Sequence, residues 1–219
     1  MGGPSFCGAS LLKIKTMLVN VLILTLLNII GLFSPAVKVS RVNYTVTEKS
    51  SLTLTGSSNV NKFSCTTYDN LSSGIIFIKA EENGDYVSFN NAVLTINIKS
   101  FDCKNPMLNK DFYNTLNAKE TPTIDIELLN ATPLTHGRIL TSNSGKFNTD
   151  VAISLNGTSK SEKIIVTWHK EDTNLYRFTG EKKLNMTDFG IEAPTAALGL
   201  IKVNNDILIQ FDLYIQVRL

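Results

Sequence analysis

Histidine and cysteine, which most often build metal and nucleophilic sites, are scarce in this chain of 219 residues. The chain contains only His136, His169 and three cysteines, with no His-Glu-x-x-His or Cys-x-x-Cys spacing. No Gly-x-Ser-x-Gly element occurs among the serines, and neither histidine has a recognisable nucleophile beside it. We expect both histidines to be solvated. We therefore predict no catalytic residue, no metal site and no enzyme.

An excess of charge of one sign is also lacking. The 21 basic residues are balanced by 19 acidic ones, and the formal net charge is +2 with no basic block. Nucleic acid is not an expected partner, because its phosphates require a concentrated positive surface. An apolar content of 43% without repeats or low-complexity linkers excludes disordered, collagen-like and coiled-coil chains. One ordinary globular domain is favoured.

One long apolar run lies near the amino terminus. Lys13 and Lys15 precede an apolar stretch over residues 17–33, and Ser34-Pro35-Ala36 supplies small residues for a cleavage site. This pattern is typical of a secretory signal peptide. We expect cleavage near Ala36, which removes residues 1–36, and a domain over 40–219 in the periplasm or outside the cell. The alternative is a retained membrane anchor, although the run is short for a bilayer core of ~30 Å.

The predicted cleavage also removes Cys7 and leaves Cys65 and Cys103 as an even pair in an exported chain. Oxidising compartments allow such a pair to form and keep a disulfide. We predict a bond between Cys65 and Cys103. The alternative is two buried free thiols.

Alternation of apolar and polar residues dominates the remaining chain. Every odd position from 207 to 217 is apolar, and this period of two predicts a strand with one buried face. Similar patterns predict strands near 52–54, 94–98, 124–128 and 151–155, with further candidates at 74–79, 85–90, 163–169 and 175–181. Turn signals such as Asn83-Gly84 and Asn156-Gly157 separate them. The fold class is therefore all-β, built from antiparallel hairpins in a sandwich or barrel.

One segment has a helical period instead. Asn105-Pro106 is typical of a helix cap and first turn, and Leu108, Phe112 and Leu116 recur every four positions. We predict a short amphipathic helix that ends before Thr121-Pro122, because the residue before a proline avoids helical backbone angles.

Closing the strands into a barrel would remove exposed sheet edges, and a barrel of about eight strands is either filled by side chains or holds one small ligand. The inward candidates are mainly Ile, Leu, Val and Phe, so a cavity would suit a lipid tail rather than a charged metabolite. The pattern alone leaves both a packed core and a ligand cavity open.

A set of segments occurs in a characteristic order over residues 51–217: 51–63, 94–102, 108–111, 121–127, 178–181, 184–191, 201–203 and 206–209. Together they resemble the YceI-like family of exported lipid- and polyisoprenoid-binding proteins. The resemblance implies an extended, lipocalin-like, eight-stranded antiparallel barrel that holds an isoprenoid chain without covalent chemistry. Met186 and Thr187 stand where many members have an Arg, and the Cys65/Cys103 pair resembles a cysteine-containing subset.

We therefore expect an exported, non-catalytic protein that binds an isoprenoid-type lipid or a quinone, with no cofactor and with transient contact with an envelope membrane. The wall residues predicted from pattern are Phe63, Phe77, Ile96, Ile98, Trp168, Phe178, Phe211 and Leu213. A one-residue error in register would turn any of them to the opposite face. The alternative is an envelope interaction module with a packed core. The sequence carries no signal for an oligomeric state.

Overall fold

The protein is described from a computed structural model, which covers residues 38–68, 73–80, 87–134 and 143–218. Its elements in chain order are β1 (Lys38–Val46), β2 (Ser51–Ser57), β3 (Lys62–Thr67), β4 (Ser73–Ala80), β5 (Val87–Asn90), β6 (Val93–Asn97), η1 (Ile98–Ser100), α2 (Pro106–Thr115), β7 (Thr123–Pro133), β8 (Ser144–Leu155), β9 (Thr158–Asp172), β10 (Leu175–Asn185), η3 (Met186–Phe189), β11 (Thr195–Ala196), η4 (Ala197–Gly199), β12 (Ile201–Lys202) and β13 (Asp206–Arg218). Within this described part, no helix has the length and apolarity needed to span a membrane.

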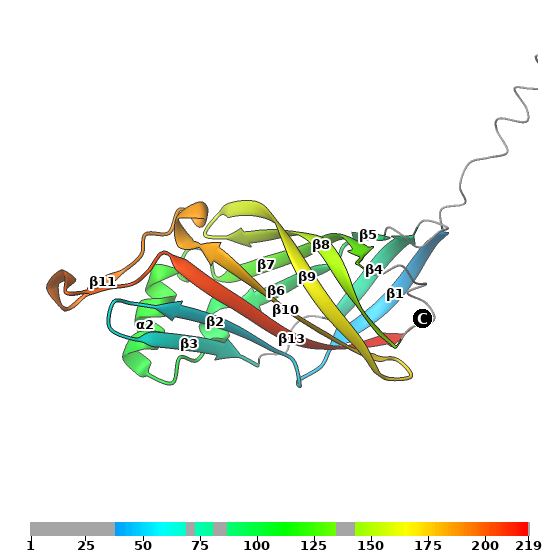
Figure 1. The fold of residues 1–219 in the computed structure, drawn as a ribbon, viewed down its shortest axis with the longest axis horizontal. Helices are drawn as coiled ribbons and strands as arrows, with labels where there is room; N and C mark the ends of the chain where they lie inside the picture. The colour runs from blue at the N-terminus through cyan, green and yellow to red at the C-terminus, as the bar shows by residue number, and fades with distance from the viewer. Residues whose placement is uncertain (1–37, 69–72, 81–86, 135–142, 219) are drawn as a thin grey trace, which may run out of the picture. The chain divides into compact units, whose positions relative to one another are not determined.

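Among the described residues, eleven strands form one antiparallel sheet that closes on itself (Figure 1). The ring runs β1–β4–β5–β7–β8–β9–β10–β13 and returns to β1 through pairs such as Tyr44 with Val217. β6 pairs with β7 beyond the place where β5 does, so β5 and β6 share one position. The fold is the eight-stranded antiparallel barrel with one α-helix that the resemblance implied. Ring closure pairs both edges of the sheet.

The long strand β13 is shared by two partners. Its first half pairs with β2, and its last residues pair with β1. Apolar side chains at alternate positions, including Ile207, Ile209 and Phe211, pack against the core, as the alternation predicted. β2 forms a hairpin with β3 instead of continuing the ring. β3 in turn contacts the chain that follows β6, through an isolated β-bridge between Thr66 and Asp102.

We call this junction between β3 and residues 101–103 the seam. A disulfide between Cys65 of β3 and Cys103 lies directly beside the bridge, so the predicted bond is confirmed. Thr66 and Asp102 exchange two backbone hydrogen bonds of 3.1 and 3.0 Å. The seam is thus closed by one covalent bond and one bridge, whereas the neighbouring strands of the ring are joined by hydrogen-bonded ladders.

Helix α2 begins where the sequence predicted. The side chain of Asn105 accepts hydrogen bonds from the backbone amides of Met107 and Leu108, which satisfies two of the unpaired donors of the first turn. The last helical residue is Thr115, and the chain leaves the helix before Thr121-Pro122, as expected.

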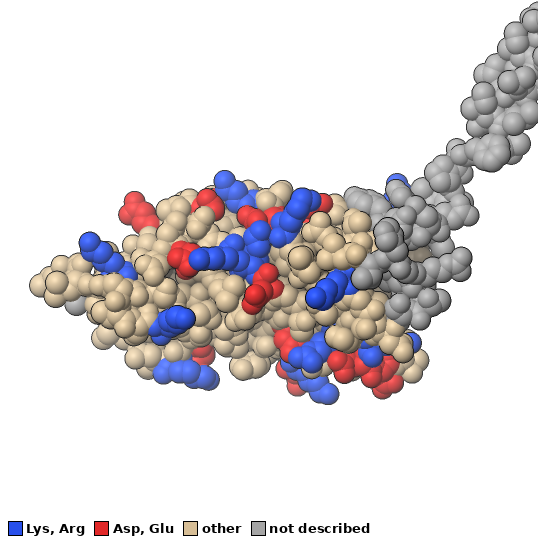
Figure 2. Space-filling view, in the orientation of Figure 1, with Lys and Arg blue, Asp and Glu red and all other residues tan. Residues whose placement is uncertain are grey.

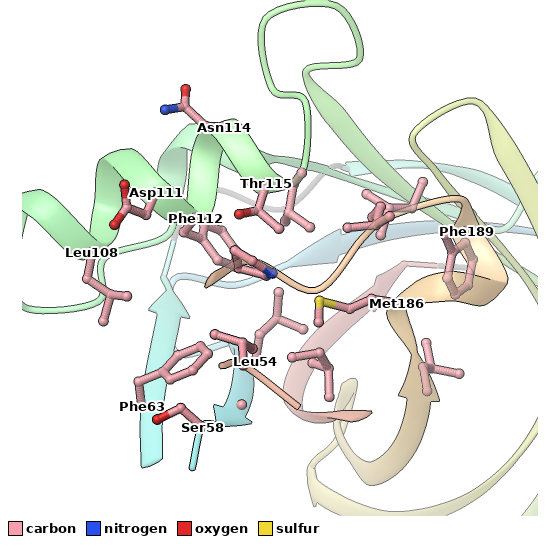
Figure 3. Close-up of a pocket in the computed structure, with 18 of the residues that line it drawn as sticks. Leu54, Ser58, Phe63, Leu108, Asp111, Phe112, Asn114, Thr115, Met186 and Phe189 are labelled. Carbon is pink, nitrogen blue, oxygen red and sulfur yellow. The ribbon is translucent and has the colours of Figure 1, made fainter. Parts of the chain in front are cut away.

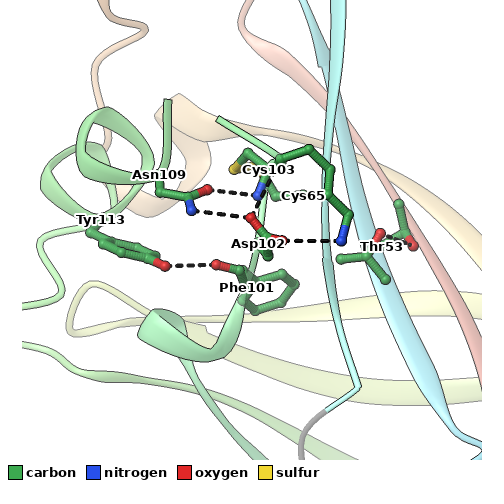
Figure 4. A network of polar contacts seen from close by, with 9 residues as sticks. Thr53, Cys65, Phe101, Asp102, Cys103, Asn109 and Tyr113 are labelled. Atoms are coloured by element: carbon green, nitrogen blue, oxygen red, sulfur yellow. Dashed lines mark hydrogen bonds and ion pairs between the residues drawn. A yellow bond between two sulfur atoms is a disulfide. The ribbon is translucent and has the colours of Figure 1, made fainter. Parts of the chain in front are cut away.

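The same helix is tied to the seam (Figure 4). The Asn109 side chain accepts a hydrogen bond from the Cys103 amide at 2.6 Å and donates one to the Asp102 carboxylate at 3.1 Å. The Tyr113 hydroxyl donates to the carbonyl oxygen of Phe101 at 2.7 Å. These contacts hold α2 at the end of the barrel where β2 and β3 lie (Figure 1).

Two local features test the predicted boundaries. The Asn156-Gly157 turn connects β8 to β9 with φ angles of +50° and +74°, so this hairpin is confirmed. The strand predicted over 94–98 ends one residue early, because Asn97 caps the short helix η1 and accepts a hydrogen bond from the Lys99 amide. Residues 1–36, Asn83-Gly84 and His136 lie outside the described residues.

Candidate ligand-binding site

A cavity of about 510 Å³ lies at the α2 end of the barrel. Pockets for small ligands typically measure about 300–1,000 Å³. Its walls come from α2, the β2–β3 hairpin, β7, β8 and the chain from β10 to β13. The apolar lining residues are Leu54, Phe63, Leu108, Phe112, Leu116, Ile124, Ile153, Leu155, Leu184, Met186, Phe189, Ile191, Pro194, Ile201, Val203, Ile207 and Ile209.

Helix α2 covers one side of the cavity. Leu108, Phe112 and Leu116 line the space, because residues four apart fall on one face of a helix (Figure 3). Phe112 also packs against the buried ring of Phe101, with ring centroids 5.5 Å apart. The helix therefore presents an apolar wall to the cavity while its other face is solvated.

The opposite wall needs a glycine. A Cβ atom placed on Gly56 of β2 would lie 2.5 Å from the Phe63 ring, which real contacts essentially never show. Phe63 lines the cavity from β3 and can occupy this position only because Gly56 has no side chain.

The polar part of the lining is small and almost uncharged. Ser58, Asn61, Asn114 and Thr195 contribute neutral groups, and Asp111 of α2 is the one charged side chain among the described lining residues. Asp111 is exposed to solvent. An apolar chain can therefore bury against the walls while a polar end group stays near water.

The seam contains a charged group, the carboxylate of Asp102, which is stabilised by its neighbours. Hydrogen bonds from the Asn109 side chain and the Lys104 amide lower the pKa of Asp102 to about 2. Lys104 also pairs with this carboxylate at 3.1 Å. Because Asp102 stays ionised well below neutral pH, its carboxylate keeps accepting a hydrogen bond from Asn109 and so helps to hold α2 in place.

The predicted wall residues are distributed over the whole barrel. Phe63 lines the cavity. Ile96 and Ile98 are fully buried in the core, and Phe211 and Leu213 pack against that core without lining the cavity.

The three other predicted wall residues also lie outside the lining. Trp168 is buried and stacks on Phe147 with ring centroids 6.2 Å apart, and Phe178 pairs with it across the strands. Phe77 is 43% exposed and opposite Arg41, so β4 turns it outward rather than into the barrel. This is the one-residue register difference that a period of two makes possible.

Most of the lining residues were missed by pattern reasoning. The useful signal was the stripe of Leu108, Phe112 and Leu116, since an amphipathic helix must cover an apolar surface. Met186, one of the two residues that stand where the resemblance implied an Arg, is buried and lines the cavity. Its side chain therefore contributes to the apolar wall.

The described residues around the cavity include few side chains that could take part in catalysis or bind a metal ion. Within residues 38–218, excluding the undescribed gaps, no cluster of His, Cys, Asp and Glu could hold a metal ion. His169 is exposed on β9, as expected. Asp111 has no paired base among the described lining residues.

Comparison with known proteins identifies relatives of this barrel. The sequence profile of the YceI-like domain matches residues 36–215. The crystal structure of Burkholderia cenocepacia BcnA is similar, with a TM-score of 0.57 and 19% identity over 80% of this chain and 99% of that chain. A polyisoprenoid-binding domain from Saccharophagus degradans, implicated in plant cell wall breakdown, gives a TM-score of 0.56 and 9% identity over 80% and 98% of the two chains. No curated protein matches the chain.

Proposed function

Because this chain belongs to the YceI-like domain family, we propose that it is an exported, non-catalytic binding protein that holds an isoprenoid-type lipid or a quinone at the α2 end of its barrel. The cavity of about 510 Å³ carries this proposal. An empty apolar space of this size is not needed for stability, since protein cores normally pack densely. A packed interaction module has no use for such a space.

The binding energy would come mainly from the hydrophobic effect. Burial of a hydrocarbon chain contributes about 0.8 kcal/mol per CH₂ group, so several buried groups suffice for useful affinity without a specific polar contact. The lining agrees with this mode, because it is aliphatic and aromatic apart from the few polar groups named above. No covalent step is part of the proposal.

Export is supported by two separate features. Residues 1–36 have the pattern of a signal peptide. The Cys65–Cys103 disulfide persists in oxidising compartments such as the periplasm or the extracellular space. We propose that cleavage near Ala36 releases the barrel, which forms one compact unit from Val37 to Leu219.

The test is native mass spectrometry on residues 37–219 purified without detergent, followed by addition of a long-chain quinone and a polyprenol. We expect a one-to-one apolar adduct. Phe63→Asp should weaken uptake at least tenfold, because it places a carboxylate in the apolar wall. Phe77→Asp is the matched control, since the same change on an exposed phenylalanine leaves the cavity unchanged.

Thermal unfolding of both variants verifies that they remain folded. An apo protein that also refuses both added lipids would refute the carrier function and favour a packed interaction module. An equal loss of lipid uptake in Phe63→Asp and Phe77→Asp would place the ligand outside this cavity.

A further inference from the structure

Two neighbouring turns leave large aliphatic side chains in solvent at the α2 end of the barrel. Leu198 is fully exposed, and Leu200 and Val60 are 76% and 64% exposed. Leu198 and Leu200 belong to the β11–β12 hairpin, and Val60 belongs to the turn between β2 and β3. Other exposed apolar residues are less informative. Val39, Tyr68 and Leu134 lie near undescribed residues, Phe77 and Ile165 lie on separate strands, and Met107 lies in the first turn of α2, outside both turns.

Hydrogen bonds join the two turns into one surface. The Asn59 side chain donates to the Leu200 carbonyl oxygen at 2.9 Å and accepts from the Lys202 amide at 2.9 Å. The Asn59 amide donates to the Lys202 carbonyl oxygen at 3.1 Å, and Ser58 bridges to Val203. The apolar side chains are therefore held together by paired backbone.

The backbone of Leu198 is strained. Its φ and ψ angles of +56° and +35° fall in the left-handed region, which a non-glycine residue occupies only at an energetic cost. The next residue, Gly199, also has a positive φ of +86°. A strained leucine that contacts no core points to a role outside the barrel.

The charges on these turns have one sign. Lys62 and Lys202 are exposed on the strands that leave the two turns, and residues 58–62 and 195–203 contain no acidic residue. Figure 2 shows an uncharged tip at the end from which β11 projects in Figure 1, with basic side chains and an acidic group farther back. Aliphatic side chains backed by lysines match the interface of a bilayer with anionic lipids.

The same turns border the cavity. Ser58, Asn61 and Thr195 belong to its lining, together with Ile201 and Val203. Asp111, the acidic residue of the lining, comes from α2 and not from either turn (Figure 3). A membrane that contacts the turns would therefore lie next to the cavity.

We propose that Val60, Leu198 and Leu200, flanked by Lys62 and Lys202, form a docking surface for an anionic lipid bilayer. This inference rests on the proposed function in one respect, since docking there places the cavity beside the membrane from which a lipid would enter. The leucines enter the interface, and the lysines remain at the level of the headgroups.

The experiment is flotation of residues 37–219 with vesicles of equal parts phosphatidylglycerol and phosphatidylcholine, and with vesicles of phosphatidylcholine alone. We expect stronger binding to the anionic vesicles. Leu198→Ser with Leu200→Ser should lower the partition coefficient at least about tenfold. Lys62→Gln with Lys202→Gln should lower it roughly fivefold per lysine on anionic vesicles only.

The matched control is Ile165→Ser with Phe77→Ser, which removes two exposed apolar side chains elsewhere and should not change binding. Absence of wild-type flotation, or equal losses in the control and the leucine variant, would overturn the docking surface. Uptake of the quinone from a dispersion without vesicles is measured on the same samples. Uptake without flotation refutes docking alone, and flotation without uptake refutes the carrier function alone.

Discussion

The disulfide across the seam allows a quantitative test of how the cavity end is stabilised. Cys65 and Cys103 are separated by 38 positions, and the bond constrains the unfolded chain to a closed loop of that length. In the chain-entropy description, closing a loop of this size contributes about 4 kcal/mol to the free energy of unfolding. Both cysteines are buried in the core, so the folded barrel has little freedom to change when the bond is broken.

We therefore expect reduction to lower the free energy of unfolding of residues 37–219 by about 4 kcal/mol, measured by urea denaturation and circular dichroism. The slope of this free energy against urea should rise, because a reduced unfolded chain is less compact and exposes more surface. Cys65→Ala with Cys103→Ala is the control for the reductant, which should have no effect on that variant.

A loss below about 1 kcal/mol with an unchanged slope would refute the reasoning. It would mean that the unfolded chain keeps the two cysteines close together without the bond. Quinone uptake by the reduced, folded protein shows whether the disulfide also affects ligand binding or only stability. We expect uptake to be kept while the reduced protein is folded, because the Thr66–Asp102 bridge and the contacts of Asn109 and Tyr113 still hold the seam.

Three further predictions concern the same end of the barrel. The pKa of Asp102 falls from 3.8 to about 2 on folding, so its stabilising contribution is complete above pH 4 and is lost as the pH falls toward 2. In an acid titration followed by circular dichroism, Asp102→Asn should reduce the loss of stability between pH 4 and pH 2. An unchanged titration curve would show that Asp102 does not cause this loss. Gly56→Ala should displace the Phe63 ring, weaken quinone uptake and destabilise the fold by about 1–3 kcal/mol, and normal uptake would show that the ring moves without cost. Asn105→Ala should lower the free energy of unfolding by about 1 kcal/mol, whereas Asn105→Asp should preserve it, and equal losses would argue against the helix cap.

Sequence patterns identified strands best where one face is buried and the other is polar. β13 follows this rule over most of its length, so its limits were predicted to within one residue. β1 and β3 were not predicted, because Arg41, Lys62 and the many Ser and Thr residues weaken their apolar alternation. The two-residue strands β11 and β12 are too short to show any period.

The binding site was harder to predict than the fold. β4 contains Ile75, Ile76, Phe77 and Ile78 in succession, and a continuous apolar run does not indicate which residues face inward. Trp168 shows a different limit. It is buried as expected but lies outside the cavity lining, because alternation determines the face of a strand and not the end of the barrel. The positions of α2 and of the chain after β10 depend on tertiary contacts that no local pattern contains.

The pairing of β13 has a consequence for the order in which the barrel is completed. This strand is the last of the barrel in chain order, and it supplies a neighbour to β1, β2 and β10. A growing chain therefore cannot close the ring until residues 206–218 have been synthesised. Until then, β1 keeps only β4 as a neighbour and β10 keeps only β9, so the ring stays open between β1 and β10. Barrel closure is thereby coupled to the completion of the polypeptide.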